Sequence, residues 1–154
     1  MVQVTRCEVR AACCLVLLFF LYCMIITRFV LFHMSGYRDL EIYRLAFDLA
    51  VRVHRATFLL PKFELYEQGS QIRRSTKSVK DQIAEGYGRR RYKADFIKFL
   101  VYSHASCDEA LSQLDMIIIL YPEITEFSPL LGEYEILGRK INSYIDYVDN
   151  NWRT

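Results

Sequence analysis

Basic side chains gather in one part of the sequence, between Arg73 and Lys98. Nine basic and only three acidic residues lie in this stretch, which therefore carries a net charge of +6. Such side chains, interleaved with tyrosines, are suited to bind phosphates and to stack on bases. The residues expected to contact a nucleic acid are Arg73, Arg74, Lys77, Lys80, Arg89, Arg90, Arg91, Tyr92 and Lys93.

The spacing of these residues predicts two neighbouring groups. Arg73, Lys77 and Lys80 fall within an arc of about 60° on a helical wheel, and together with Arg74 they form what we term the basic ridge. Residues 89–93 follow that helix directly, and we term them the basic turn. Two other interpretations remain open: a solvated face, or a face that pairs with the acidic part of a neighbouring subunit. The second arises because residues 108–154 carry a net charge of −6.

Side chains arranged for catalysis or for metal binding are mostly absent from the sequence. It contains no phosphate-binding loop, zinc-ligand pair or nucleophile elbow. His104, Cys107 and Asp108 could share one helix face, but the Glu-x-x-His pairs of a di-iron bundle are missing. Glu85 is a lone carboxylate without a second titrating group to complete an acid–base pair. We therefore expect no enzymatic activity, no metal and no cofactor.

The elements that must position the basic residues are helices. Only 6 Gly and 3 Pro occur in 154 residues, and 53% of residues are hydrophobic, which disfavours disorder and a turn-rich β fold. Gly86 and Gly88 are expected to stop the second helix, and Ser128 to cap the fourth. Short connections predict an all-α, antiparallel up-down-up-down four-helix bundle over residues 34–154. Apolar residues recur at helical spacing in residues 39–60, 68–87, 93–121 and 128–150.

The first of these helices is apolar on two sides. One stripe includes Tyr43, Phe47 and Phe58, and a second lies on roughly the opposite side. A second apolar face left in water would exceed the patches that monomers usually expose, so we expect it to meet another copy of the chain. The alternative is a central helix that buries both faces within one subunit. The residues expected between copies are Ile42, Leu45, Leu49, Val53 and Leu60.

Residues 1–33 form an apolar extension that differs from the rest. No charge occurs from Ala11 to Thr27, which is at the lower edge of the length that spans a bilayer. Three interpretations compete: a membrane anchor over residues 11–32, a cleaved signal peptide, or an upstream extension of a protein that begins at Met34. After Met34 only Cys107 remains, so no disulfide framework is expected, and a reducing cytoplasm suits this part.

Residues 70–115 resemble the core of the four-helix-bundle proteins encoded in intervening sequences of bacterial 23S ribosomal RNA genes, also called the S23 ribosomal protein family. The most specific motifs are QIRR at residues 71–74 and IAEGYGR at residues 83–89, and YRDLEIYRLAFDLAVRVHRAT at residues 37–57 is similar to that family's first helix. The resemblance covers about residues 37–150. Gln82 stands where many relatives have Asn, and Lys80 where they often have Pro.

This resemblance implies a homopentameric bundle without established enzymatic activity. Members usually begin a few residues before the motif at Tyr37, which favours a start at Met34. The fold is more distantly similar to the accessory variability determinant of diversity-generating retroelements, a basic pentamer that works with a reverse transcriptase and its RNA. We therefore expect a cytoplasmic homo-oligomer that binds structured RNA without catalysis. The alternative is a structural or protein-interaction module, in contact with a membrane only if residues 1–33 are retained.

Overall fold

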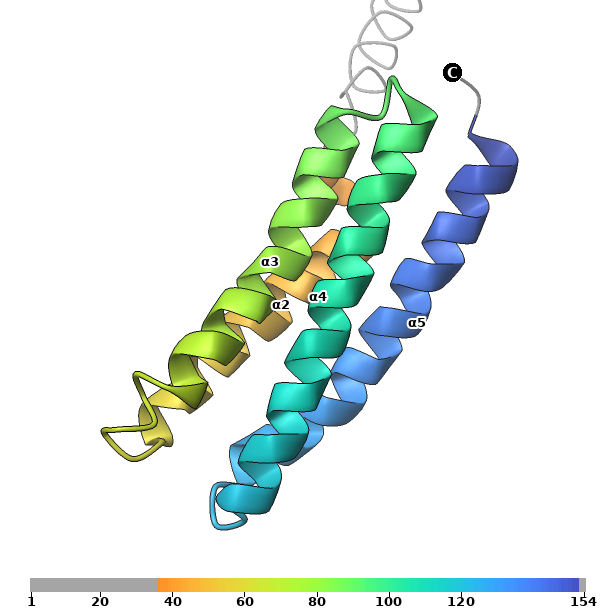
Figure 1. Cartoon of the computed structure of the whole chain (residues 1–154). Coiled ribbons are helices and arrows are strands. Elements are labelled where there is room, and N and C mark those ends of the chain that lie inside the picture. The colour runs from red at the N-terminus through yellow and green to blue at the C-terminus, as the bar shows by residue number, and fades with distance from the viewer. Residues whose placement is uncertain (1–35, 153–154) are drawn as a thin grey trace, which may run out of the picture. The chain divides into compact units, whose positions relative to one another are not determined.

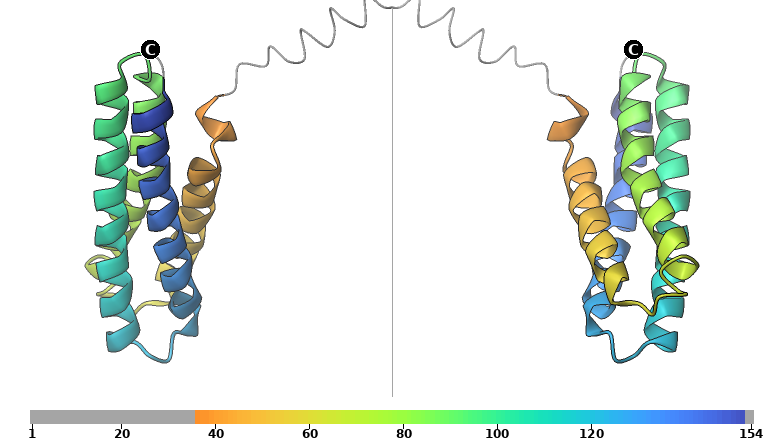
Figure 2. Two further views of the ribbon diagram at one scale, coloured as in Figure 1. Left: turned by 90° about the vertical axis from the view of Figure 1, so that its right-hand side faces the viewer. Right: turned by 90° about the vertical axis from the view of Figure 1, so that its left-hand side faces the viewer.

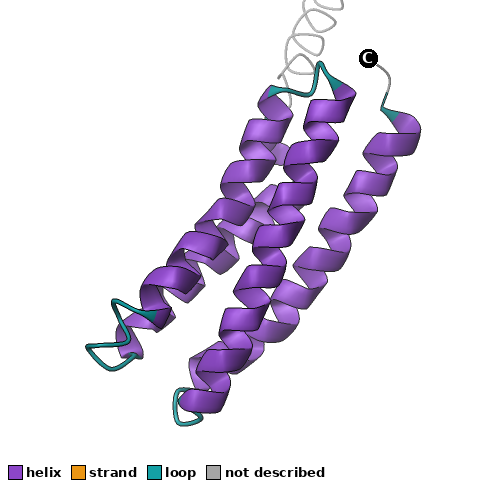
Figure 3. Ribbon diagram, viewed as in Figure 1, coloured by secondary structure: helices purple, strands orange, loops and turns teal. Residues whose placement is uncertain are grey.

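The structure is a computed structural model that describes residues 36–152 of the chain. Four α-helices dominate this part, and no strand occurs within it, as Figure 3 shows. The all-α, four-helix class predicted from the sequence is confirmed. The helices are α2 (Glu41–Ala56), α3 (Gln68–Gly88), α4 (Lys93–Leu120) and α5 (Ser128–Asn151), and the 3-10 turns are η1 (Tyr37–Asp39), η2 (Thr57–Leu59) and η3 (Thr125–Phe127).

The predictions about the apolar extension fall outside the described part of the chain. They concern residues 1–33 as a membrane anchor, a signal peptide or an upstream extension before Met34. Among the helices between residues 36 and 152, none combines the length and the apolar character needed to cross a bilayer.

Successive helices run in opposite directions and lie side by side (Figure 1). α3 packs against α4 on one side and against α2 on the other, and α5 packs against α4. The turn between α3 and α4 lies at one end of the bundle, whereas the connections from α2 to α3 and from α4 to α5 lie at the other (Figure 1). The basic turn therefore lies at the same end of the bundle as η1, the start of α2 and the C-terminal end of α5.

Each helix contributes a stripe of apolar side chains to a common core. The predicted stripe of α3 is the buried one, because Ile72, Val79 and Ile83 are fully shielded from solvent. Small polar side chains share this stripe and bond within it: the Thr76 hydroxyl donates to the carbonyl of Ile72 at 2.8 Å. The largest side chains of the core come from the other helices and connections and include Phe96, Leu100, Leu114, Phe127, Tyr134, Leu137 and Ile141.

Each of the two apolar stripes of α2 faces the side that was predicted for the other. The stripe that we expected to meet another subunit lies in the core of the chain itself, where Leu49 and Val53 are completely buried. The other stripe faces outward, and Phe47 and Phe58 are 49% and 64% exposed. Both stripes look alike in the sequence, so only the packing of α2 against α3 and α5 decides between them. Of the residues predicted at an interface, Ile42, Leu49, Val53 and Leu60 are buried in the core, and Leu45 packs against it.

α3 ends at Gly88, close to where its glycines were expected to stop it, but no residue of the described part has a positive φ. Gly86 lies where α3 and α4 approach each other closely. A Cβ atom at this position would lie 2.8 Å from the Cβ of Phe99 and 3.3 Å from Cδ2 of Phe96. Gly86 is therefore needed for helix packing and not for a left-handed helix end.

The start of α5 also differs from the prediction. Ser128 is the first residue of the helix and not its cap, because Phe127 occupies the cap position and already has helical backbone angles. The 3-10 turn η3 leads directly into the helix, so no side-chain hydrogen bond caps this end. Pro129 follows within the first turn, where its missing N–H has no partner to lose.

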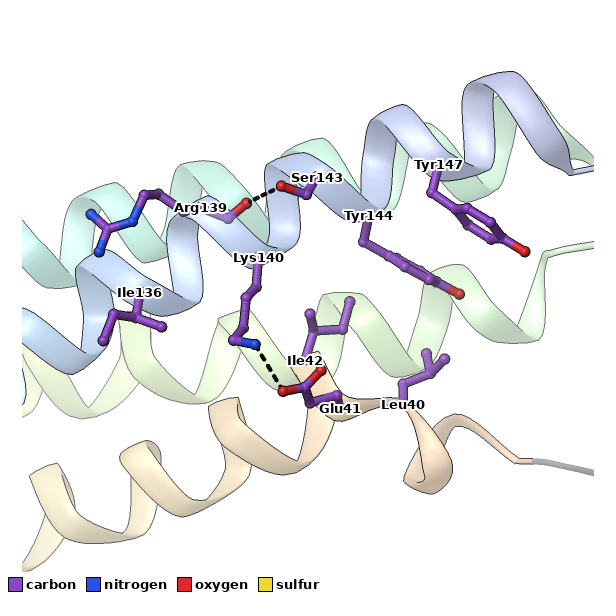
Figure 4. A pocket seen from close by; sticks show the side chains of 9 residues that line it. All are labelled: Leu40, Glu41, Ile42, Ile136, Arg139, Lys140, Ser143, Tyr144 and Tyr147. Atoms are coloured by element: carbon purple, nitrogen blue, oxygen red, sulfur yellow. Dashed lines mark hydrogen bonds and ion pairs between the residues drawn. The ribbon is translucent and has the colours of Figure 1, made fainter.

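Two ion pairs join α2 to α5, the neighbouring pair of helices with the least extensive packing. Arg52 forms hydrogen bonds with both carboxylate oxygens of Glu133, and Lys140 donates to Glu41 at 2.8 Å. Figure 4 shows the second pair in a groove of about 510 Å³ that Tyr144 also lines. Figure 2 shows α2 and α5 from two further sides, and the two helices lie farther apart toward the start of α2.

Candidate nucleic-acid interface

The burial of one face of α3 forces its basic ridge outward. Ile72, Val79 and Ile83 occupy the core, and the basic residues lie on the remaining surface of the helix. Arg74 and Lys77 are exposed, whereas Arg73 and Lys80 are half-buried. The ridge is therefore present as predicted, but its four members differ in how freely they can reach a ligand.

Arg73 is tied into the connection between α2 and α3. Its Nη1 donates to the hydroxyl of Thr57 at 3.0 Å, and its Nη2 donates to the carbonyl of Leu65 at 2.9 Å. The Thr57 hydroxyl in turn donates to the carbonyl of His54 at 2.7 Å. These bonds supply a partner to the carbonyl of Leu65 in the connection and, through Thr57, to that of His54 near the end of α2. Arg73 therefore serves the fold, and we remove it from the group of phosphate contacts.

Lys77 and Lys80 face α2 across a shallow pocket of about 320 Å³. The side of α2 that lines this pocket is the outward apolar stripe, with Phe47, Val51 and His54, followed by Arg55. Burial, followed by the positive charges of Lys77 and Arg73, lowers the pKa of His54 below its ordinary value. The imidazole is consequently neutral near pH 7, and the positive charge of the pocket comes from the lysines and Arg55.

Arg90 of the basic turn is held by its own surroundings. Its Nη1 donates to the carbonyl of Tyr87 at 2.9 Å, and its guanidinium lies 4.2 Å from the centre of the Tyr87 ring. Its backbone carbonyl accepts a hydrogen bond from the indole Nε1 of Trp152 at 3.1 Å. Arg90 thereby fastens the turn to the C-terminal end of α5, and its side chain has little freedom to contact a ligand.

The other members of the basic turn point away from the bundle to different degrees. Lys93 forms an ion pair with Asp149 at 3.4 Å, which ties it to α5. Arg89 pairs with Glu85 at 2.9 Å and lies over the ring of Phe99, yet it remains exposed. Arg91 is exposed, and it forms no ion pair with any residue between 36 and 152. Tyr92 is 64% exposed, so its ring is accessible for stacking.

The structure thus divides the predicted residues into two groups. Arg73, Arg90 and Lys93 hold the fold together. The remaining ones lie along α3 and at its end, where all are exposed except Lys80, which is half-buried and pairs with Asp81. From Arg74 to Arg89 the helix rises by about 22 Å, so these residues form an elongated surface and not a compact cluster. The residues available to a ligand are Arg74, Lys77, Lys80, Arg89, Arg91 and Tyr92.

Sequence reasoning missed the contribution of α2 to this surface. Phe47 was assigned to an apolar stripe, with no expectation that this stripe meets α3. Arg55 and Lys77 line the same pocket because of how α2 and α3 are aligned. The spacing of residues within one helix does not determine this alignment.

Other reactive groups offer no second site of comparable strength. Burial, with a smaller contribution from Asp108, raises the pKa of the Cys107 thiol to about 12, so it stays protonated near neutral pH. His104 and Asp108 are 3.2 Å apart on the surface of α4, as their spacing predicted. Within residues 36–152, no three His, Cys, Asp or Glu side chains come together in a way that could hold a metal ion.

Comparison with known proteins identifies relatives for most of the bundle. The family model described as 23S rRNA-intervening sequence protein matches residues 38–143 of the chain. This range begins in η1 and ends within α5, so it includes the whole basic ridge and the basic turn. No curated protein matches the chain.

Proposed function

The chain belongs to the family of 23S rRNA-intervening sequence proteins, and from that premise we propose that it binds structured RNA through the basic ridge and the basic turn, without catalysis. The observation that carries this proposal is the outward row of basic residues along α3. Lys77 and Arg91 have no acidic partner within residues 36–152, although exposed acids are frequent on α4 and α5. The acids nearest the row, Asp81 and Glu85 on α3, pair with Lys80 and Arg89.

The proposal specifies how RNA would be held. Phosphates would contact the five basic residues that do not hold the fold together, four of them exposed and Lys80 half-buried, and Tyr92 would stack on a base at the end of the row. Such contacts release counterions, so the affinity falls with salt in proportion to the number of phosphates neutralised. We also propose that the bundle lies in the cytoplasm, where such an RNA would be met. The five contacts are Arg74, Lys77, Lys80, Arg89 and Arg91.

A salt titration of the full-length protein tests this function. The logarithm of the affinity for a labelled single-stranded RNA should fall with the logarithm of salt at a slope of about −3.5, for five contacts on a single strand. A ribosomal RNA helix and a DNA duplex are titrated alongside to compare substrates. Binding that is absent for all three nucleic acids, or that does not depend on salt, would exclude this function.

We also propose that the protein assembles with copies of itself through the outer face of α4. Large apolar side chains lie exposed along this helix, and Ile119 is 76% exposed. These side chains form two groups, Val101 and Tyr102 near the start of α4 and Met116, Ile119 and Leu120 near its end. Exposed apolar groups of this size support self-association.

Self-association raises a second candidate function, a protein-interaction module in which the basic turn pairs with acids of another copy. Asp108, Glu109 and Asp115 are exposed on α4 and could receive it. Replacing Arg89 and Arg91 together by Glu separates the two functions. If RNA binding disappears while sedimentation shows the same assembly, the basic turn contacts RNA. If the assembly dissociates while RNA binding is unchanged, the module is the better description.

A further inference from the structure

The pocket between α2 and α3 contains side chains that RNA binding by the basic ridge and the basic turn does not require. Its wall on α3 carries two lysines, Lys77 and Lys80, and its wall on α2 is formed by Phe47, Val51 and His54, with Arg55 at one end. A volume of about 320 Å³ is at the lower end of the range found for small-molecule sites.

The two ends of the pocket differ in chemistry. α2 and α3 run in opposite directions side by side (Figure 1), so the Arg55 end of α2 lies at Lys77 and the Phe47 end lies toward Lys80. The first end offers two cations that form no ion pair within residues 36–152. The second offers the ring of Phe47, which is 49% exposed. A ligand that fits both ends carries an anionic group at one end and a flat ring system at the other.

His54 separates the two ends and supports the same assignment. Its ring packs edge-on against Phe58, with 5.2 Å between ring centres. Its Nδ1 is buried without a hydrogen-bond partner, so protonating the ring would leave a charged donor unsatisfied. A neutral, flat imidazole between Phe47 and Arg55 offers a surface on which a base or ribose can pack, and it does not compete with the cations for the phosphate.

We propose that this pocket binds a phosphorylated nucleotide, with its phosphate between Lys77 and Arg55 and its base against Phe47. The proposal rests on the proposed RNA binding and sharpens it, because the pocket lies beside the basic ridge that would hold the rest of the strand. The same chemistry is offered by the 5′-phosphorylated end of an RNA and by a free nucleoside monophosphate. The pocket is bounded by side chains of both helices, so it would accept a terminal nucleotide more readily than one within a duplex.

Two short RNAs that differ only in a 5′-phosphate test this proposal. Both are labelled at the 3′ end and titrated with the full-length protein at one salt concentration, and adenosine monophosphate is titrated separately by calorimetry. The phosphate should strengthen binding about tenfold, the effect of one charge-assisted contact. This preference should vanish in Lys77→Gln, which removes a cation, and in Val51→Trp, which fills the pocket. It should persist in Lys98→Gln, a lysine on α4 that does not line the pocket.

The outcomes distinguish the pocket from the wider function. Equal affinity for the two RNAs in the wild-type protein would overturn the proposal that the pocket binds a phosphorylated nucleotide, and it would leave the proposed RNA binding intact. A preference that survives in both Lys77→Gln and Val51→Trp would also overturn it, because the phosphate would then bind elsewhere. If neither RNA binds but adenosine monophosphate binds in a manner that requires Lys77, the pocket holds a free nucleotide and the proposed RNA binding is wrong. If nothing binds, both proposals fail.

Discussion

Arg52 and Glu133, which are 81 residues apart in the chain, meet through two hydrogen bonds across the boundary between α2 and α5. Nη1 donates to Oε2 at 2.5 Å and Nη2 donates to Oε1 at 2.6 Å. Two parallel bonds between a guanidinium and a carboxylate fix the relative orientation of their helices as well as their distance. This pair therefore holds together the part of the bundle where apolar packing is least extensive.

The first prediction concerns the pH dependence of stability. The hydrogen bonds from Arg52 lower the pKa of Glu133 below its ordinary value of 4.5. A carboxylate of this kind contributes stability above about pH 4.5 and loses it as the pH falls through the folded-state pKa. Glu133→Gln should therefore lower the free energy of unfolding by about 1 kcal/mol near neutral pH. The difference from the wild-type protein should shrink in acid, which urea unfolding at several pH values measures.

Glu135→Gln is the matched control for this prediction. Glu135 lies two residues away on α5, and its only ion pair within residues 36–152 is a 3.9 Å contact with Arg139 on the same helix. The control should remain within about 0.5 kcal/mol of the wild-type protein at every pH. Equal effects of the two substitutions near neutral pH would mean that the contact between α2 and α5 adds nothing to stability.

The second prediction concerns Gly86. A Cβ atom there would meet the Cβ of Phe99 at 2.8 Å, and that atom cannot move without moving the backbone of α4. Gly86→Ala should therefore destabilise the bundle by about 1–2 kcal/mol, even though alanine favours a helix more than glycine does. Gly132→Ala on α5 is the control, because no atom outside its own helix lies within 4 Å of its Cβ position. Denaturant unfolding should show that this variant is at least as stable as the wild-type protein.

The third prediction separates two neighbouring arginines. Arg73 holds Thr57 and the carbonyl of Leu65, whereas Arg74 is exposed and bonds only to Gln71 on its own helix. Arg73→Gln should lower the free energy of unfolding by about 1–3 kcal/mol, because buried acceptors lose a charged donor. Arg74→Gln should change it by less than about 0.5 kcal/mol. Thermal unfolding that ranked the two substitutions the other way would contradict the structural role assigned to Arg73.

The fourth prediction concerns the number of phosphate contacts. Replacing Arg89 and Arg91 together by Gln should change the slope of log affinity against log salt from about −3.5 to about −2.1 on single-stranded RNA, because two contacts are lost. Arg139→Gln is the control, since Arg139 also pairs with a Glu four residues away and is exposed, but lies on α5. The control should keep the original slope. The same slope for both proteins would place the contacts outside the basic turn.

The sequence predicted the four helices closely because each one buries a stripe with helical spacing. The ends of α3 and α4 lie within one residue of the predicted ones, whereas α2 ends earlier and continues as the 3-10 turn η2. Its two apolar stripes could not be distinguished, since periodicity gives the number of apolar faces and not the neighbour that each one meets. The burial of Leu49 in the core shows which of the two stripes faces outward.

The candidate interface was predicted less completely than the fold. Charge and spacing located the basic ridge, because consecutive turns of one helix determine which residues share a face. They did not reveal that Arg73 and Arg90 bond to carbonyls of the chain, because Leu65 and Tyr87 must first be positioned by the fold. For the same reason, the sequence did not predict that Arg55 of α2 and Lys77 of α3 line one pocket.

Trp152, the single tryptophan of the chain, makes the basic turn observable in the unlabelled protein. Its indole bonds to the carbonyl of Arg90, and its ring lies 5.4 Å from that of Phe96, close to the residues that would meet RNA. The intensity and wavelength of its fluorescence therefore report on this end of the bundle alone. A ligand at the basic turn would alter that emission, whereas one confined to the pocket between α2 and α3 would leave it almost unchanged.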